Sequence, residues 1–93
     1  MKENSESRLF RLAATFPTLT SRMRDAAPGE ILPIIERCAN ASGVGEGCQQ
    51  AALFLCWVWN PYAHDFNMAK AWPIWDSAHR EAYQAWAKEP YWL

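Results

Sequence analysis

The chain has 93 residues, of which 51% are hydrophobic and 20% are charged, and its formal net charge at pH 7 is -1. This length fits a single domain over residues 1–93, and the composition is globular, which excludes a disordered chain. The small net charge argues against a domain built mainly to hold nucleic acid.

Charge is nevertheless uneven along the chain. Residues 1–24 contain five basic and two acidic side chains, which leaves a net charge of -4 for the remainder. A mildly basic first quarter is typical of a solvated helix face, and contact with an acidic partner is the alternative interpretation.

The sequence indicates no membrane segment and no secretion signal. The longest unbroken apolar run, residues 51–59, has about half the length that a membrane-spanning helix needs. Residues 1–10 lack the apolar stretch of a signal peptide. We therefore expect a soluble, cytoplasmic protein.

The three cysteines predict buried free thiols. Cys38, Cys48 and Cys56 are odd in number and show no Cys-x-x-Cys spacing. A metal site formed by Cys48, Cys56 and either His64 or His79 is an alternative that no spacing supports. We accordingly expect no disulfide, no metal and no cofactor.

The first third of the chain predicts helices. No period-2 alternation of useful length occurs anywhere, so no strand is expected. Apolar residues recur at helical spacing over residues 5–16, and Pro17 should end that helix. Residues 18–26 predict a second short helix with Thr18 as its N-cap.

The next helix is predicted over residues 29–41. Pro33 lies inside this pattern and is compatible with it only in the first turn, so the regular helix should begin near Leu32. Three glycines between residues 43 and 47 predict a flexible connection. A phosphate-binding loop is the alternative, but that motif needs a preceding strand.

Residues 46–59 form the strongest predicted helix. Its second half, "AALFLCWVW", is apolar on every side, which is typical of a helix in the middle of a domain. Asn60 and Pro61 should end it, a loop follows, and "MAKA" predicts one helical turn. Pro73 should open the last helix, which runs to about residue 88, with Trp72 outside helical geometry.

The last predicted helix has a broad aromatic face. At about 100° per residue, Trp75, His79, Ala82 and Trp86 fall in one narrow sector. Polar and charged side chains cover the opposite side of this helix, namely Asp76, Ser77, Arg80, Glu81, Gln84 and Lys88.

A domain of this size has little interior for its aromatic residues. The folded chain should expose roughly 5,500 Å² out of roughly 15,500 Å² in the unfolded state, and each large ring must hide on the order of 150–250 Å². We expect Trp75 and Trp86 to pack inward. One or two of four further side chains should stay partly exposed: Trp72, Tyr83, Tyr91 and Trp92. Complete burial of these rings in the core and a cage for a small cation are the other interpretations.

The sequence does not predict an active site. His79 follows Asp76 by three residues, but on the helical wheel Asp76 is expected to point about 60° away from it, and no nucleophile is indicated. Cys56 lies inside an apolar helix, where burial makes a thiol inert. We therefore predict that the protein is not an enzyme.

The middle of the chain resembles a known family. The segment "CQQAALFLCWVWN" is followed by a loop ending in "DFNMAKAW" and by the amphipathic helix, within about residues 47–86. This order resembles a family of small uncharacterised bacterial proteins often carried on mobile elements, in which a helix ends in a Trp-x-Asn or Trp-Trp-Asn type of signature followed by Phe-Asp-Leu and a tryptophan. The resemblance implies a helical fold and an accessory role, and transfers no activity. Asn67 departs from the aspartate of that pattern, and the corresponding residues here are Trp57, Trp59, Asn60, Phe66, Asn67, Met68 and Trp72.

Together these features predict an all-α, single-domain helical bundle of four to five helices. The leading functional hypothesis is a non-enzymatic protein-interaction module, encoded by a phage or mobile element as an accessory or inhibitor protein. It would bind a partner protein, or a second copy of itself, through Trp72, Tyr83, Tyr91 and Trp92. The alternative is a small-ligand binding module whose aromatic pocket consists of Trp75, His79 and Trp86.

Overall fold

A computed structural model describes residues 5–40 and 45–93, and their regular secondary structure is entirely helical, which confirms the all-α prediction. The accessible surface is 5748 Å², close to the area expected from chain length. The elements in chain order are α1 (Ser5–Ala14), α2 (Pro17–Thr20), the short 3-10 helix η1 (Pro28–Glu30), α3 (Ile31–Asn40), α4 (Glu46–Trp59), α5 (Met68–Ile74) and α6 (Ser77–Lys88).

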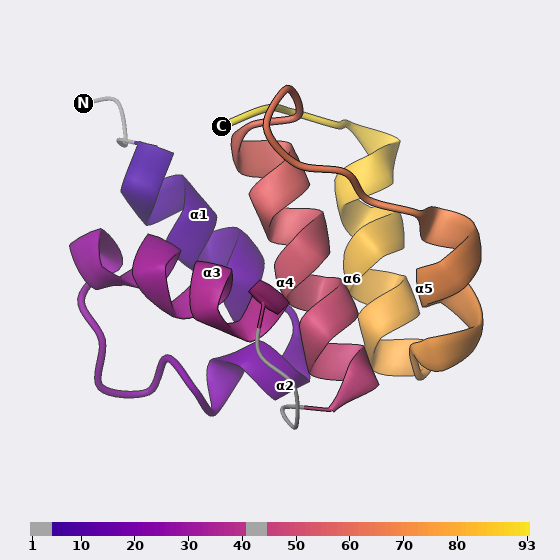
Figure 1. Ribbon diagram of the computed structural model, residues 1–93, viewed down its shortest axis with the longest axis horizontal. Helices are drawn as coiled ribbons and strands as arrows, with labels where there is room; N and C mark the ends of the chain where they lie inside the picture. The colour runs from indigo at the N-terminus through magenta and orange to yellow at the C-terminus, as the bar shows by residue number, and fades with distance from the viewer. Residues whose placement is uncertain (1–4, 41–44) are drawn as a thin grey trace.

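Helix α4 lies at the centre of the molecule, as its sequence predicts. Figure 1 shows α1, α2 and α3 on one side of α4, and α5 and α6 on the other. A helix covered on both sides needs apolar residues all round. The buried positions of α4 are Cys48, Gln50, Ala51, Ala52, Phe54, Leu55, Cys56 and Val58.

The first part of the chain is helical as predicted, but its first two helices are shorter than predicted. Helix α1 ends at Ala14, and Pro17 opens α2, where proline's missing N–H costs nothing. The prediction of Thr18 as the N-cap was wrong, because Phe16 occupies that position and Thr18 lies within α2. Helix α2 stops at Thr20, six residues before the predicted end at 26. In α3, Pro33 occupies the first turn, as expected.

The glycine-rich connection lies partly outside the described residues. Gly45 is described and precedes α4 with φ of 91°, a conformation that glycine adopts without steric strain. This conformation turns the chain into the central helix.

The prediction for the start of the last helix was wrong. Pro73 lies inside α5, and Trp72 is helical. Pro73 has no N–H to donate to the carbonyl of residue 69, but the backbone N–H of Trp75 still donates to the carbonyl of Ala71 at 2.9 Å. Helix α6 begins instead after Asp76, whose side chain accepts a hydrogen bond from the backbone N–H of His79 at 3.0 Å.

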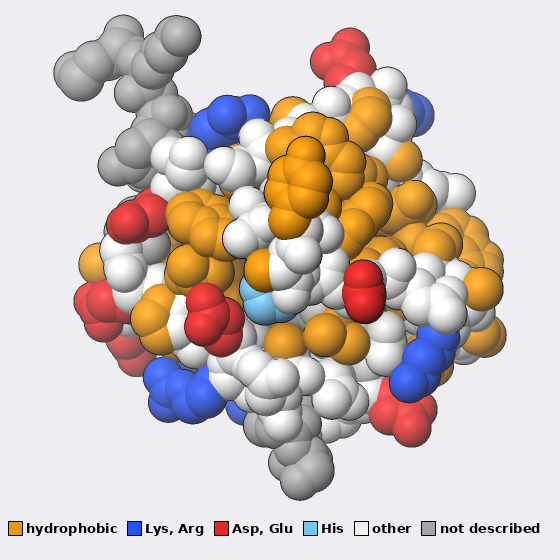
Figure 2. Space-filling view, turned by 45° about the horizontal axis from the view of Figure 1, so that its top comes forward, with side chains coloured by type: hydrophobic (Ala, Val, Ile, Leu, Met, Phe, Trp, Pro, Cys, Tyr) orange, Lys and Arg blue, Asp and Glu red, His pale blue; other side chains and the backbone are white. Residues whose placement is uncertain are grey.

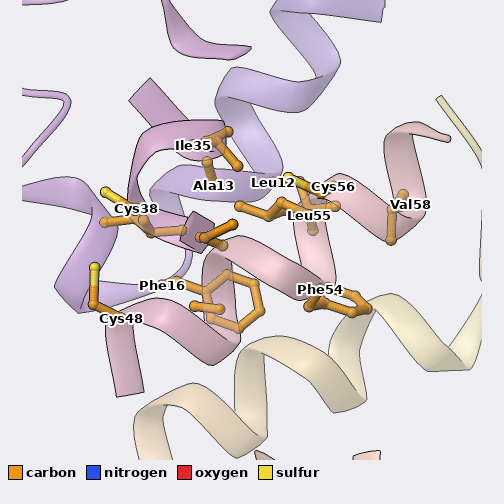
Figure 3. Packing of buried hydrophobic residues seen from close by; sticks show 14 of the residues in the cluster. Leu12, Ala13, Phe16, Ile35, Cys38, Cys48, Phe54, Leu55, Cys56 and Val58 are labelled. Carbon is orange, nitrogen blue, oxygen red and sulfur yellow. The ribbon is translucent and has the colours of Figure 1, made fainter. Parts of the chain in front are cut away.

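The core gathers residues from all parts of the chain around α4. Figure 3 shows Leu12 and Phe16 from the first part of the chain beside Leu55 and Phe54 of α4, and the Phe16 and Phe54 ring centroids are 5.6 Å apart. The three cysteines are free and buried, as predicted. Burial raises the pKa of the Cys56 thiol to about 11, so this group stays protonated near neutral pH.

Candidate interaction surface

The aromatic residues of the last two helices form a network with Phe54 at its centre. Trp75 is 2% exposed and Trp86 6% exposed, so both pack inward as predicted. Their rings meet the Phe54 ring edge-on, at centroid distances of 6.3 Å and 5.1 Å. Tyr83 meets Phe54 in the same way at 5.4 Å. Edge-to-face packing of this kind is favourable beyond simple burial.

The residues after α6 fold back across the end of α4. The Trp86 indole N–H donates to the backbone carbonyl of Tyr91 at 3.0 Å, and the backbone N–H of Leu93 donates to the carbonyl of Val58 at 3.1 Å. In Figure 1 this segment passes beside the loop that follows α4. The two hydrogen bonds fix the segment to both neighbouring helices.

Trp92 is held by this segment with half of its surface in solvent. Its ring packs edge-on against Trp57 at 4.8 Å and Trp86 at 5.8 Å, yet it remains 50% exposed. Tyr62, in the loop after α4, is fully exposed. We call the side chains of Trp57, Tyr62 and Trp92, all at the C-terminal end of α4, the terminal aromatic surface. Figure 2, turned to bring this end forward, shows hydrophobic side chains gathered there with charged groups mostly at the margins.

Trp72 and Tyr83, two of the four predicted contact residues, form a separate pair. Their rings meet edge-on at 6.4 Å, and both are half-buried. Arg80 covers Trp72, with its guanidinium carbon 5.1 Å from the ring centroid, and its Nε donates to the Trp72 carbonyl at 2.9 Å. This packing covers part of the Trp72 and Tyr83 surface that was predicted to contact a partner.

The other two predicted residues, Tyr91 and Trp92, belong to the C-terminal segment. Tyr91 is half-buried, and the guanidinium carbon of Arg8 lies 5.0 Å from its ring centroid. The four predicted residues are therefore divided between two places. Sequence reasoning missed Tyr62, although an aromatic residue directly after the helix stop Asn60-Pro61 was an available signal.

His79 is the middle member of a hydrogen-bonded chain of three side chains. Its Nδ1 lies 2.7 Å from Oδ1 of Asp76, and its Nε2 lies 2.8 Å from Oγ1 of Thr18. The hydrogen bonds from His79 are the main cause that lowers the pKa of the Asp76 carboxyl. The expectation that Asp76 points away from His79 was wrong, and Thr18 was not foreseen as its partner.

A threonine, a histidine and an aspartate in this order resemble the hydrogen-bond order of hydrolytic triads. Here, however, His79 is only 3% exposed and its ring lies 5.8 Å from Phe16 and 6.3 Å from Trp75. A reacting group must reach the nucleophile and the base together. The burial favours a structural role, in which the chain of hydrogen bonds joins α6 to α2.

The residues predicted for the alternative ligand pocket are buried and pack within the core. Trp75 stacks on His79 with an angle of 23° between the rings, and its indole N–H donates to the Gly47 carbonyl at 3.3 Å. The indole N–H of Trp86 is likewise engaged by the C-terminal segment. A cation cage needs open ring faces, so the observed packing gives this alternative little support.

Two further features of the described residues bear on the site. Within residues 5–40 and 45–93, no three histidine, cysteine, aspartate or glutamate side chains are grouped so that they could hold a metal ion. None of the helices in that part of the chain combines the length and apolarity needed to cross a bilayer.

Comparison with protein-family models, with curated proteins and with solved structures gives no match to this chain. The resemblance to mobile-element proteins therefore stays a prediction.

Proposed function

We propose that this protein is a non-enzymatic interaction module that binds a partner protein through the terminal aromatic surface. The observation that carries the proposal is Trp92, which is half exposed although it packs against Trp57 and Trp86. Exposed tryptophan and tyrosine side chains that cluster are typical of binding surfaces.

The exposed indole is also held in place before any partner arrives. Its ring edge rests on two other indoles, and the backbone on either side of it is fixed by the hydrogen bonds of Tyr91 and Leu93. Binding therefore immobilises few additional rotamers of Trp92. Such preorganisation leaves more of the interaction energy available for affinity.

The protein has no exposed aromatic residue elsewhere that competes for this role in the described part of the chain. Tyr62 and Trp92 are its exposed large hydrophobic residues, and both follow the two helices that end near each other at this side of the molecule. We expect a partner protein to contact both side chains. A small ligand would need a concave site instead.

The test is a pull-down from the native host with the wild-type chain, the double variant Tyr62→Ala with Trp92→Ala, and the control Trp72→Ala. We expect a protein that the wild type and the control retain and that the double variant loses by tenfold or more. Analytical ultracentrifugation of the three chains should detect the same pattern if the partner is a second copy. Equal retention by all three chains, with equal sedimentation, overturns the proposal.

An accessory role on a phage or mobile element stays part of the hypothesis and rests on the sequence resemblance alone. The neighbouring genes in the host genome provide its test. Genes of phage or transposon type on both sides favour the role, and a conserved metabolic operon opposes it.

A further inference from the structure

A groove beside the terminal aromatic surface carries positive charge on one wall and aromatic side chains on the other. It lies between α1 and the end of α6, has a volume of about 380 Å³, and is lined by Arg8, Arg11 and Thr15 on one side and Ala85, Trp86 and Tyr91 on the other. Apart from Thr15, the side chains that line it are basic, aliphatic or aromatic. The groove thus combines the two features that bind an acidic peptide with apolar side chains.

Arg8 has the geometry to bind a carboxylate. Its guanidinium lies over the Tyr91 ring at 5.0 Å, and no carboxylate of residues 5–40 and 45–93 pairs with it. A guanidinium that stacks on a ring keeps its N–H groups at the edge, where they can meet both oxygens of a carboxylate. The stacking also restrains the side chain, which reduces the entropy lost on binding.

Glu6 and Glu81, the acidic side chains of α1 and α6, do not line the groove. Glu6 of α1 has its carboxylate oxygen 3.1 Å from the position a Cβ of Gly29 would occupy, so it faces η1. Glu81 of α6 lines a different hollow, together with Gln84 and Lys88. The guanidinium of Arg8 therefore gives the groove a positive charge that an anion complements.

We propose that the groove binds an acidic peptide segment of the partner protein, with a carboxylate on Arg8 and an adjacent apolar side chain on Tyr91 and Ala85. The inference rests on the proposed function and names the chemistry of the partner. Because Tyr91 lines the groove and directly precedes Trp92, a segment bound in the groove lies next to the terminal aromatic surface.

The test uses synthetic peptides as probes, because the partner is unidentified. One capped ten-residue peptide contains two glutamates beside a leucine and a phenylalanine, and its match has glutamines in place of both glutamates. We expect isothermal titration calorimetry to show about tenfold weaker binding of the glutamine peptide, the loss typical of a charge-assisted hydrogen bond. Raising the salt from 0.05 M to 0.5 M should weaken only the glutamate peptide.

Three arginine variants locate the binding. Arg8→Gln should weaken the glutamate peptide about tenfold, whereas Arg24→Gln removes the same charge from an exposed position elsewhere and should leave binding unchanged. Arg8→Lys keeps the charge without the planar fork and should lie between them, and circular dichroism checks that each variant is folded. Equal affinity for the two peptides, or equal losses in Arg8→Gln and Arg24→Gln, overturns the inference.

The outcomes also separate this inference from the proposed function. If the Tyr62 and Trp92 double variant no longer retains the host protein but Arg8→Gln does, the proposed function is supported and the acidic-peptide inference is overturned. If Arg8→Gln is the variant that no longer retains the host protein and the double variant still does, the proposed role of the terminal aromatic surface is overturned. If a ten-nucleotide single strand binds through Arg8 and the glutamate peptide does not, nucleic acid replaces the peptide and the inference is overturned.

Discussion

The core around α4 and the C-terminal segment contain the same kinds of aromatic residue, but these residues differ in how much of their surface is exposed. Phe54 is completely buried within a helix that has neighbours on both sides, whereas Trp92 is half exposed on a segment with no regular structure. The hydrophobicity of the side chain is similar in both regions. What differs is the number of helices and segments that surround the side chain. Exposure here therefore depends on position in the fold and not on residue type.

The largest expected difference between the two regions is in stability. Phe54→Ala should lower the free energy of unfolding by about 3–5 kcal/mol, because it leaves a cavity at the centre of the aromatic network. Trp92→Ala should lower it by less, about 1–3 kcal/mol, because only half of the indole is buried and its ring contacts are with Trp57 and Trp86. Urea unfolding followed by circular dichroism measures both. Equal losses for the two variants would show that the C-terminal segment belongs to the core.

The second prediction concerns the polar link inside the buried region. Thr18→Val keeps the shape of the side chain but leaves Nε2 of the buried His79 without its partner, so the free energy of unfolding should fall by about 1–3 kcal/mol. Thr18→Ser keeps the hydroxyl and should restore most of the loss. A Thr18→Val variant as stable as the wild type would contradict a structural hydrogen bond. A loss in Thr18→Ser alone would assign the contribution of Thr18 to its methyl group.

The smallest effect should come from the exposed end of the same link. The pKa of Asp76 is lowered in the folded state, chiefly by its hydrogen bonds with His79, so the ionised carboxylate contributes stability above its unfolded pKa of about 3.9. That contribution is lost as the pH falls through the folded pKa. Asp76→Asn retains a capping side chain, so the variant should be less stable than the wild type at pH 7 and converge with it only as the pH falls from the unfolded pKa through the lower folded pKa. Thermal unfolding over this pH range measures the difference, and a constant gap would rule out the carboxylate charge as its source.

Features that depend on periodicity and local chemistry could be predicted from the sequence. The apolar run of residues 51–59 indicates a central helix, and the spacing of Trp75 and Trp86 indicates that both face inward. Both predictions are confirmed, because one helix turns every side chain to a fixed direction and the apolar side must find a neighbour.

Features that depend on distant contacts or on competing local signals could not be predicted in this way. Thr18 meets His79 across 61 residues of sequence, and no local pattern selects that pair. The predicted start of the last helix is wrong because two local signals compete: Pro73 favours a helix start, but Asp76 provides the N-cap of α6. The candidate surface was predicted only in part, since Tyr91 and Trp92 are brought to α4 by two backbone-directed hydrogen bonds that residue types do not reveal.

The three indoles of Trp57, Trp86 and Trp92 have consequences for spectroscopy. Trp86 is already shielded from water, whereas Trp92 has half of its surface in contact with it. A protein that covers Trp92 should therefore shift the intrinsic emission to shorter wavelengths and reduce quenching by iodide, while the buried indole contributes an unchanged background. The molecule thus contains its own optical reporter at the place where we expect docking.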